Sequence, residues 1–380
     1  MYADELLIPW FECLRQELDA LDVYDCHTHV GVNDPSGFSA TFGELVEALE
    51  FIDGRAAVFP LKEPAGYREA NLRLIEAAAE TGDLLVAFAR LDPADAPALR
   101  AQEALEAGAR GLKLHPAGEE FDLSDPRLAD VWELADHERL PVMVHAGPEL
   151  ETVGETVLEI ASTHPGARLI VAHAAIIDFA WLWREVAAFP NLFLDTSWWS
   201  PTDVLAVLSL VPAGHVLSAS DLPYCTPLSG ALSTIRCALE LGLSREEIAP
   251  VLGGQFERLL RRDDPVFPEA SPQRIHAPLD PLLERVYVYL TAALEPMQRG
   301  GDPEQMLVLA RHATQVPADH PQAESMRSIQ ELLDLYERHR DGLQTSNQYA
   351  PGWDLIAAGA LIARTPAAPV PAPVVGRTRS

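Results

Sequence analysis

The stretch VYDCHTHVG, residues 23–31, places His27 and His29 two positions apart in a run rich in apolar and β-branched residues. On a β-strand, residues i and i+2 point the same way, with backbone positions roughly 6 to 7 Å apart. Two imidazoles at this spacing can therefore bind one metal ion. The pair also fits two structural histidines, because an HxH pattern alone is a weak signal.

Isolated polar residues also interrupt the later apolar runs. They are Lys113 and His115 in GLKLHP, His145 in PVMVHAG, His173 in RLIVAHAA, Asp195 in LFLDTSW and Asp221 in HVLSASD. Polar side chains are costly to bury without partners, so this placement indicates a site. Three imidazoles and a carboxylate suit Zn²⁺ or a similar divalent ion, with room for a bound water; the four candidate ligands are His27, His29, His145 and Asp221.

Two of these residues have a candidate catalytic role. His173 can act as a general base that takes a proton from a metal-bound water and returns it to the leaving group. The alternative is a core histidine bonded to a backbone carbonyl. Asp221 can complete the metal shell while its second oxygen orients or deprotonates the water, or it can be the N-cap of a helix.

The elements that must position these residues alternate along the chain. From residue 23 to about 262, eight short β-rich runs alternate with stretches of helical periodicity. This alternation predicts parallel strands with right-handed crossovers. Eight units fit an α/β fold of the (β/α)8 TIM-barrel type, whose active-site residues gather at the C-terminal ends of the strands. An open doubly wound sheet is the competing architecture, but no glycine-rich phosphate loop follows the first run.

The rest of the chain divides by composition. We predict that the barrel occupies residues 1–262 and that the proline-rich residues 263–281 form a linker. Residues 282–364 show helical periodicity and are predicted to be a helical appendage. The Pro/Ala-rich residues 365–380 are predicted to be disordered.

Composition limits the partners. The formal net charge of −29 disfavours binding to nucleic acid or to an anionic membrane. No apolar run is long enough to span a membrane, and no positive region precedes an apolar segment at the N-terminus, so we expect a cytoplasmic protein. The four cysteines are too few for a disulfide scaffold. A small-molecule substrate is expected, and self-association into a homo-oligomer is left open.

The ordered set DCHTHVG, GLKLHP, VMVHAG, VAHAA, LDTS and SASDLPY resembles the amidohydrolase-2 branch of the metal-dependent amidohydrolase superfamily. The resemblance covers residues 23 to about 262 and implies a TIM barrel with one catalytic divalent metal, expected to be Zn²⁺. It implies His27, His29, His145 and Asp221 as ligands and His173 as the acid/base. The sequence departs from the usual pattern at SASD, where Gly-Ser-Asp is commoner.

The role of Lys113 determines whether one or two metal ions are expected in the site. In other branches of the superfamily a lysine at this place is carboxylated and bridges two metals, which would make His173 a ligand. The amidohydrolase-2 branch usually has one metal, so we expect Lys113 to face the substrate as a cation. His115 shares a face with Lys113 and is predicted to line the pocket, with packing beside Pro116 as the alternative.

The substrate is indicated only weakly. Arg90 could hold a carboxylate bidentately, or it could pair with Asp92 or a helix end. Trp198, next to Trp199, could wall an apolar or aromatic ligand or pack under a loop. We expect Asp195 to bind pocket water or a neighbouring side chain, and Asp25 to support the site by hydrogen bonding.

The favoured function is a metal-dependent hydrolase, in which a water activated by the divalent metal attacks an amide, ester or lactone. The alternative is a metal-dependent non-oxidative decarboxylase of an aromatic or unsaturated acid, because the branch contains both. A third hypothesis is a catalytically silent barrel that binds a ligand or partner.

Overall fold

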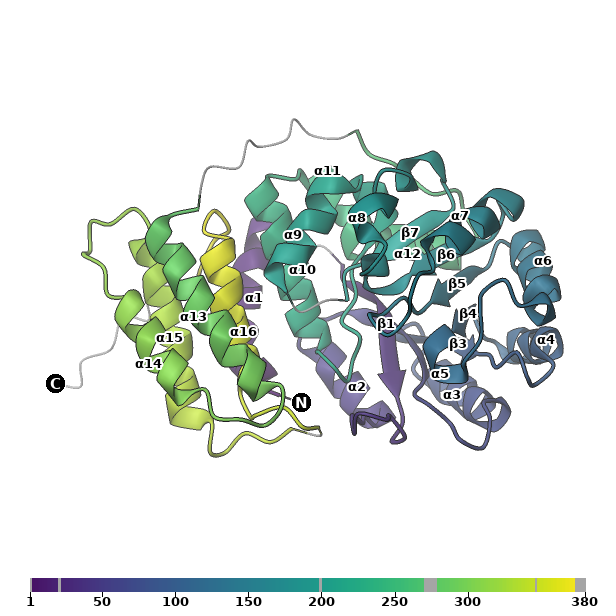
Figure 1. Ribbon diagram of the computed structural model, residues 1–380, viewed down its shortest axis with the longest axis horizontal. Coiled ribbons are helices and arrows are strands. Elements are labelled where there is room, and N and C mark those ends of the chain that lie inside the picture. Colours follow the sequence, from purple (N-terminus) through teal and green to yellow (C-terminus); the bar gives the residue numbers. More distant parts are fainter. Residues whose placement is uncertain (1, 20–21, 198–199, 270–278, 346, 373–380) are drawn as a thin grey trace.

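Eight parallel strands form the central sheet, and each strand pairs with the next along the chain (Figure 1). A computed structural model describes residues 2–19, 22–197, 200–269, 279–345 and 347–372. The strands are β1 (Tyr24–Val30), β2 (Arg55–Pro60), β3 (Leu85–Arg90), β4 (Gly111–Leu114), β5 (Pro141–Val144), β6 (Arg168–Val171), β7 (Leu192–Asp195) and β8 (Val216–Leu217).

Backbone hydrogen bonds between β1 and the segment at and after β8 bring the sheet back on itself. The Cys26 N–H donates to the Ser218 carbonyl at 3.1 Å, and the His29 N–H donates to the Leu222 carbonyl at 2.7 Å. The sheet is therefore a nearly closed barrel, and the predicted TIM-barrel fold with a C-terminal helical region is confirmed.

Helices and short helical turns connect the strands. The α-helices are α2 (Phe42–Glu50), α3 (Arg68–Glu80), α4 (Pro97–Ala107), α5 (Pro116–Glu119), α6 (Ala129–Glu138), α7 (Gly154–Thr163), α8 (Phe179–Leu182), α9 (Pro201–Leu210), α10 (Pro227–Leu241), α11 (Arg245–Ala249) and α12 (Gln255–Leu260). The 3₁₀ turns are η1 (Pro126–Leu128), η2 (Ala172–Ala175), η3 (Val186–Ala188) and η4 (Ala213–His215), and η5 (Pro250–Gly254) is a π-helical turn.

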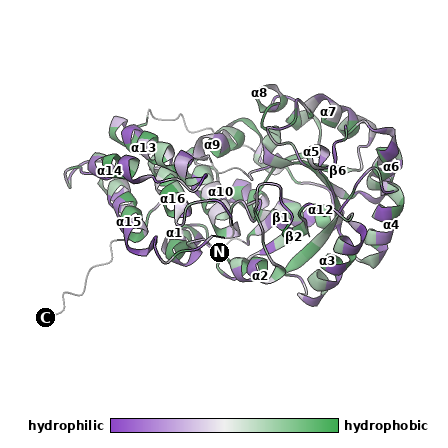
Figure 2. Cartoon of the chain, turned by 60° about the horizontal axis from the view of Figure 1, so that its bottom comes forward, coloured by the Kyte–Doolittle hydropathy of each residue, from purple (hydrophilic) through white to green (hydrophobic). Residues whose placement is uncertain are grey.

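The strands are apolar on both faces because they are covered on both sides. In β2, Ala57 and Phe59 belong to the core inside the barrel, together with Phe88 and Phe193 from other strands. Ala56 and Val58 alternate with them and belong to the core between the sheet and the helices. In Figure 2 the strands are mainly hydrophobic, whereas hydrophilic residues mark the outer helices.

The C-terminal helices pack against the barrel directly and also against the N-terminal helix. They are α13 (Pro281–Met297), α14 (Glu304–Ala313), α15 (Ala323–His339) and α16 (Trp353–Arg364), and in Figure 1 they lie together on the side of the barrel where α1 (Asp4–Glu17) is found. The direct contact is made by α16 on α9 and α10. The Ala3 N–H donates to Asp354 Oδ2 and Trp10 Nε1 donates to Ser328 Oγ, each at 2.7 Å. Helix α1, which lay inside the predicted barrel domain, thus links the two regions.

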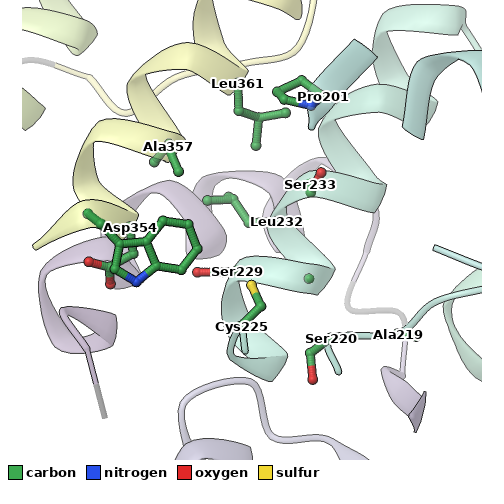
Figure 3. Close-up of a pocket in the computed structure, with 13 residues that line it drawn as sticks. Pro201, Ala219, Ser220, Cys225, Ser229, Leu232, Ser233, Asp354, Ala357 and Leu361 are labelled. Carbon is green, nitrogen blue, oxygen red and sulfur yellow. The ribbon is translucent and has the colours of Figure 1, made fainter. Parts of the chain in front are cut away.

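A small cavity of about 40 Å³ lies between α10 and α16. Figure 3 shows Leu232 and Ser233 of α10 on one side, and Ala357 and Leu361 of α16 on the other. Its size matches one or two water molecules rather than a substrate.

Residues 365–372 run back over α10. The buried Arg236 donates to the carbonyls of Thr365, Ala368 and Pro369 at 2.8, 3.3 and 2.7 Å. Because these carbonyls hydrogen bond a buried guanidinium, this part of the predicted disordered tail is packed; residues 373–380 lie outside the described residues. Within the predicted linker, residues 270–278 also lie outside them. Among the described residues, no helix has the length and apolar character that crossing a bilayer requires.

Candidate active site

A cleft of about 670 Å³ opens where the strands end. Six of the predicted site residues line it, each at or after the end of a different strand: His29, Arg90, His115, His145, His173 and Asp221. The cleft is large enough for a small-molecule ligand, unlike the cavity at the helical interface. The strand order of the barrel therefore brings together residues that are nearly 200 positions apart.

Three of the four predicted ligands converge on one point. His27 Nε2 lies 3.2 Å from His29 Nε2, and both lie close to Asp221 Oδ1, at 3.1 and 3.2 Å respectively. A tetrahedral ion with ligand distances of about 2.0 to 2.1 Å holds its ligand atoms about 3.3 Å apart. Asp221 Oδ1 is buried and has no hydrogen-bond donor of good geometry among the described residues. This three-residue cluster fits a divalent metal ion; we call it the inner cluster.

The hydrogen bond of His27 and the protonation of His29 suit this role. His27 Nδ1 donates to Asp195 Oδ2 at 2.8 Å, which leaves the lone pair of Nε2 facing the inner cluster. Burial and Lys113 oppose protonation of His27, but Asp221 and Asp195 together raise its pKa. Burial lowers the pKa of His29 to about 3, so this imidazole is neutral at pH 7. A neutral imidazole is the form that binds a metal.

His173 lies at the edge of the inner cluster in a strained backbone conformation. It follows β6 in the turn η2, with φ at 56°, and Asp221 after β8 has φ at 60°. Both are left-handed conformations that non-glycine residues adopt rarely and that concentrate at functional sites. His173 Nδ1 donates to the Ser197 carbonyl at 2.9 Å, which leaves Nε2 as the nitrogen that faces the inner cluster. Nε2 lies 3.9 Å from Asp221 Oδ2.

Asp195 connects the inner cluster to His173. Its Oδ2 accepts from His27, and its Oδ1 accepts from the N–H groups of His173 and Ser197 at 2.9 and 3.0 Å. Burial would raise the pKa of this carboxyl, but the contact with His27 brings it to about 2. The sequence suggested only that Asp195 would bind pocket water or a neighbour, whereas the structure gives it four donors that orient the site, because the Ser197 hydroxyl also contacts Oδ1.

Asp25 forms hydrogen bonds to both segments that meet where the barrel closes, β1 and the loop after β8. Its Oδ1 accepts from the backbone N–H groups of His27 and Ser220, at 3.0 and 3.1 Å. These bonds tie the strand that carries the HxH pair to the loop that carries Asp221. The structure therefore places Asp25 in the hydrogen-bonding role expected for it.

The fourth predicted ligand, His145, lies outside the inner cluster. Its Nδ1 is 3.3 Å from His173 Nε2, and its Nε2 contacts the carboxylate of Glu149. Its ring stacks on His115, with centroids 3.8 Å apart. His115, His145 and Glu149 form a second group of possible metal ligands, which we call the outer cluster. Glu149 was not among the residues predicted from the sequence; its position four residues after His145, in the following loop, was the available signal.

Lys113 lies beneath the inner cluster and is fully buried. Its Nζ is 3.2 Å from His27 Nε2 and 4.7 Å from the centre of the Phe59 ring. Burial lowers the pKa of Lys113 to about 8. The lysine therefore adjoins a candidate metal ligand, so whether it faces the substrate or is carboxylated remains a prediction.

The other predicted substrate residues have mixed positions. His115 lines the cleft, and its Nδ1 accepts from the Gly118 N–H at 3.0 Å. Arg90 also lines the cleft, but its guanidinium donates to Glu119 at 2.7 Å and stacks over Tyr67. It is therefore already paired, although not with the Asp92 considered from the sequence. Trp198, like Trp199, lies outside the described residues.

Aromatic residues that were not predicted from the sequence complete the cleft. Tyr224 and Tyr349 line it, and Phe38 packs between them, with ring centroids 4.5 and 5.0 Å away respectively. Tyr349 precedes α16, so the C-terminal region contributes one wall of the cleft. This contact joins segments about 300 residues apart, which no local pattern indicates.

The sequence model of the amidohydrolase family matches residues 24–262, which is more than half of the chain. The chain belongs to the amidohydrolase family. The family assignment expected from the sequence is thereby confirmed, and members of this family are generally metal-dependent enzymes. No curated protein matches the chain.

Solved structures share the barrel. A putative amidohydrolase from Staphylococcus aureus is 16% identical, with a TM-score of 0.54, over 63% of this chain and 100% of its own. A 2,6-dihydroxybenzoate decarboxylase solved with 2,6-dihydroxybenzoate is 15% identical, with a TM-score of 0.51, over 63% of this chain and 99% of its own. At these identities the likeness shows the fold alone.

Proposed function

We propose that the protein is a metal-dependent hydrolase that uses a divalent-metal-activated water on an amide, ester or lactone. The observation that carries the proposal is the position of His173 Nε2 beside the inner cluster, 3.9 Å from Asp221 Oδ2, with Nδ1 donating to the Ser197 carbonyl. A proton acceptor at this position suits a water held by the ligands of the cluster.

Each residue of the site would have a separate role in metal binding or proton transfer. His27, His29 and Asp221 would hold the ion, for which we propose Zn²⁺. When bound, a divalent ion lowers the pKa of a water and polarises the substrate carbonyl. His173 Nε2 accepts the proton of the attacking water and returns it to the leaving group, while Ser197 fixes the ring through Nδ1. Asp195 holds His27 in the tautomer that exposes Nε2.

Decarboxylation of an aromatic or unsaturated acid remains the alternative. A 2,6-dihydroxybenzoate decarboxylase has the same fold, so the fold is compatible with this reaction. A free arginine beside the inner cluster would favour it, because the substrate carboxylate must be bound at the reacting centre. Arg90, the arginine suggested by the sequence, is paired with Glu119, and both side chains are almost fully buried. This pairing supports the hydrolase over the decarboxylase.

The test is a screen of the Zn²⁺-reconstituted protein against lactones, amides, esters and aromatic acids in ¹⁸O-labelled water, with CO2 detection. The proposal predicts one ¹⁸O atom in the acid product and no CO2. The variant His173→Asn should lose turnover, whereas His137→Asn, at an exposed histidine of α6, serves as the matched control. CO2 release without ¹⁸O incorporation would establish the decarboxylase, and failure to bind any divalent ion would contradict both reactions.

A further inference from the structure

Lysine is almost absent from this protein, and both lysines lie at the catalytic end of the barrel. Of the 28 lysines and arginines in the chain, only Lys62 and Lys113 are lysines. Lys113 adjoins His27 under the inner cluster, and Lys62, just after β2, lines the cleft. Everywhere else the chain uses arginine for a cationic side chain.

The two cations differ in what they can bind. Arginine presents a rigid planar fork, whereas lysine carries a compact ammonium with three donors on a flexible stem. A chain that uses arginine on its surface can supply charge and solubility with arginine alone. A lysine in the cleft therefore indicates a need for a compact, movable cation at that point.

The ammonium group of Lys62 has N–H donors that are not used in hydrogen bonds to the described residues. Its Nζ donates to the Gly118 carbonyl at 3.2 Å, which uses one of its three N–H groups. Within the described part of the chain, its ammonium makes no ion pair with a carboxylate. Arg90, the neighbouring cation of the cleft, is by contrast neutralised by Glu119 at 2.7 Å.

The acidic residues of the cleft are engaged elsewhere. Asp34 accepts from the Tyr224 hydroxyl at 2.6 Å, Glu149 contacts His145, and Asp221 belongs to the inner cluster. None of them neutralises Lys62. An incoming anion would therefore meet an ammonium with unused donors.

We propose that Lys62 binds an anionic group of the substrate, a carboxylate in the simplest case, and so selects acidic substrates. The charge of the whole chain supports this assignment, since at −29 it repels anions and an acidic substrate requires a local cation in the cleft. A neutral substrate would need none. Lys62 contacts no member of the inner cluster, so the anionic group that it binds is separate from the bond that reacts.

This inference rests on the proposed function for the reaction but can be tested without turnover. Selective ¹³C labelling of lysine gives two ε-methylene signals, and the variant Lys62→Arg identifies one of them by its loss. Zn²⁺-reconstituted protein is titrated with benzoate and, as an uncharged probe of the same shape, with benzamide. Benzoate should shift the Lys62 signal, and benzamide should not.

Variants separate binding from a structural role. Lys62→Gln should weaken benzoate binding about tenfold, as expected for loss of a charged hydrogen bond, and leave benzamide binding unchanged. Lys62→Arg keeps the charge but replaces the compact ammonium with a planar fork, so it should recover only part of the affinity that Lys62→Gln loses. Arg73→Gln, at an exposed position in α3, removes the same charge away from the cleft and should have no effect.

The proposal is overturned if benzoate does not bind, if it shifts only the Lys113 signal, or if Lys62→Gln weakens both probes equally. The metal content of each sample is measured in parallel. A protein that binds Zn²⁺ but shows no benzoate effect at Lys62 contradicts this inference alone. A protein that binds no divalent ion contradicts the proposed function, whatever the lysine does.

Discussion

The inner and outer clusters contain the same donor types but differ in their support. Each has two imidazoles and one carboxylate whose ligand atoms lie within 4.8 Å of one another. The His27 side chain in the inner cluster is fully buried, whereas the Glu149 side chain in the outer cluster is 46% exposed. Two of the inner residues lie in β1 and the third, Asp221, lies in the loop after β8, whereas the outer residues follow β4 and β5.

The difference teaches that residue types alone do not make a metal site. In the inner cluster, Asp195 orients His27 and Asp25 fixes the backbone that carries it. In the outer cluster, His145 is held by a stack on His115 and by an exposed glutamate. Ligands oriented by buried hydrogen bonds bind metals more tightly, so we propose that the inner cluster holds the ion.

The largest expected effect contrasts a ligand from each cluster. His27→Ala should reduce the bound metal from about one ion per chain to almost none, because three protein ligands are the usual minimum for a catalytic zinc ion. His115→Ala, the matched change in the outer cluster, should leave the metal content unchanged. Metal analysis of the purified variants, with circular dichroism to check folding, decides the matter; loss of metal only in His115→Ala would reverse the assignment.

The second largest effect is expected on the turnover number when His173, which lies between the two clusters, is replaced. His173→Asn should lower the turnover number by about 10² to 10⁴, the usual contribution of a general acid or base, while the metal content stays the same. Steady-state kinetics on the substrate found by the screen measures the change. If His173→Asn loses the ion instead, His173 is a ligand and the two-metal alternative involving Lys113 gains support.

A smaller effect, on metal affinity, is expected when Asp195, which orients His27 of the inner cluster, is replaced. Asp195→Asn should weaken metal affinity by about 10- to 100-fold, because the amide no longer imposes the required tautomer on His27. Competition with a chelator measures the affinity, and Asp130→Asn, an exposed residue of α6, is the control. An unchanged affinity would show that the hydrogen bond from His27 does not tune the site.

The smallest effect is expected in the outer cluster. Glu149→Gln should change metal affinity by less than about threefold, since half-exposed ion pairs contribute little. The same chelator competition applies. A drop as large as that of Asp195→Asn would mean that the outer cluster also holds the ion, with His145 as the shared ligand.

Much of the barrel and part of its site follow from the sequence. The eight β-rich runs predict the strands because burial on both faces requires continuous apolar residues. His27 and His29 share a face because a strand repeats every two residues. Asp221 could be added because parallel strands place their C-terminal ends at one end of the barrel.

Other features depend on contacts between distant segments. Local spacing places His145 at the end of β5, but the direction of its ring depends on Glu149, His115 and His173 around it. Residues 365–372 are proline- and alanine-rich, yet their carbonyls hydrogen bond the buried Arg236. Neither outcome is contained in the composition of the segment itself.

The sequence by itself determined the fold and the chemical types at the strand ends, because periodicity and residue chemistry are local properties. Only the tertiary structure decided which donors meet, that Glu119 neutralises Arg90 and that Lys62 keeps free donors beside it. It also brought Tyr349 from the C-terminal region into the cleft. The physical reason is that side-chain direction and charge pairing depend on neighbours supplied by the packing of remote segments.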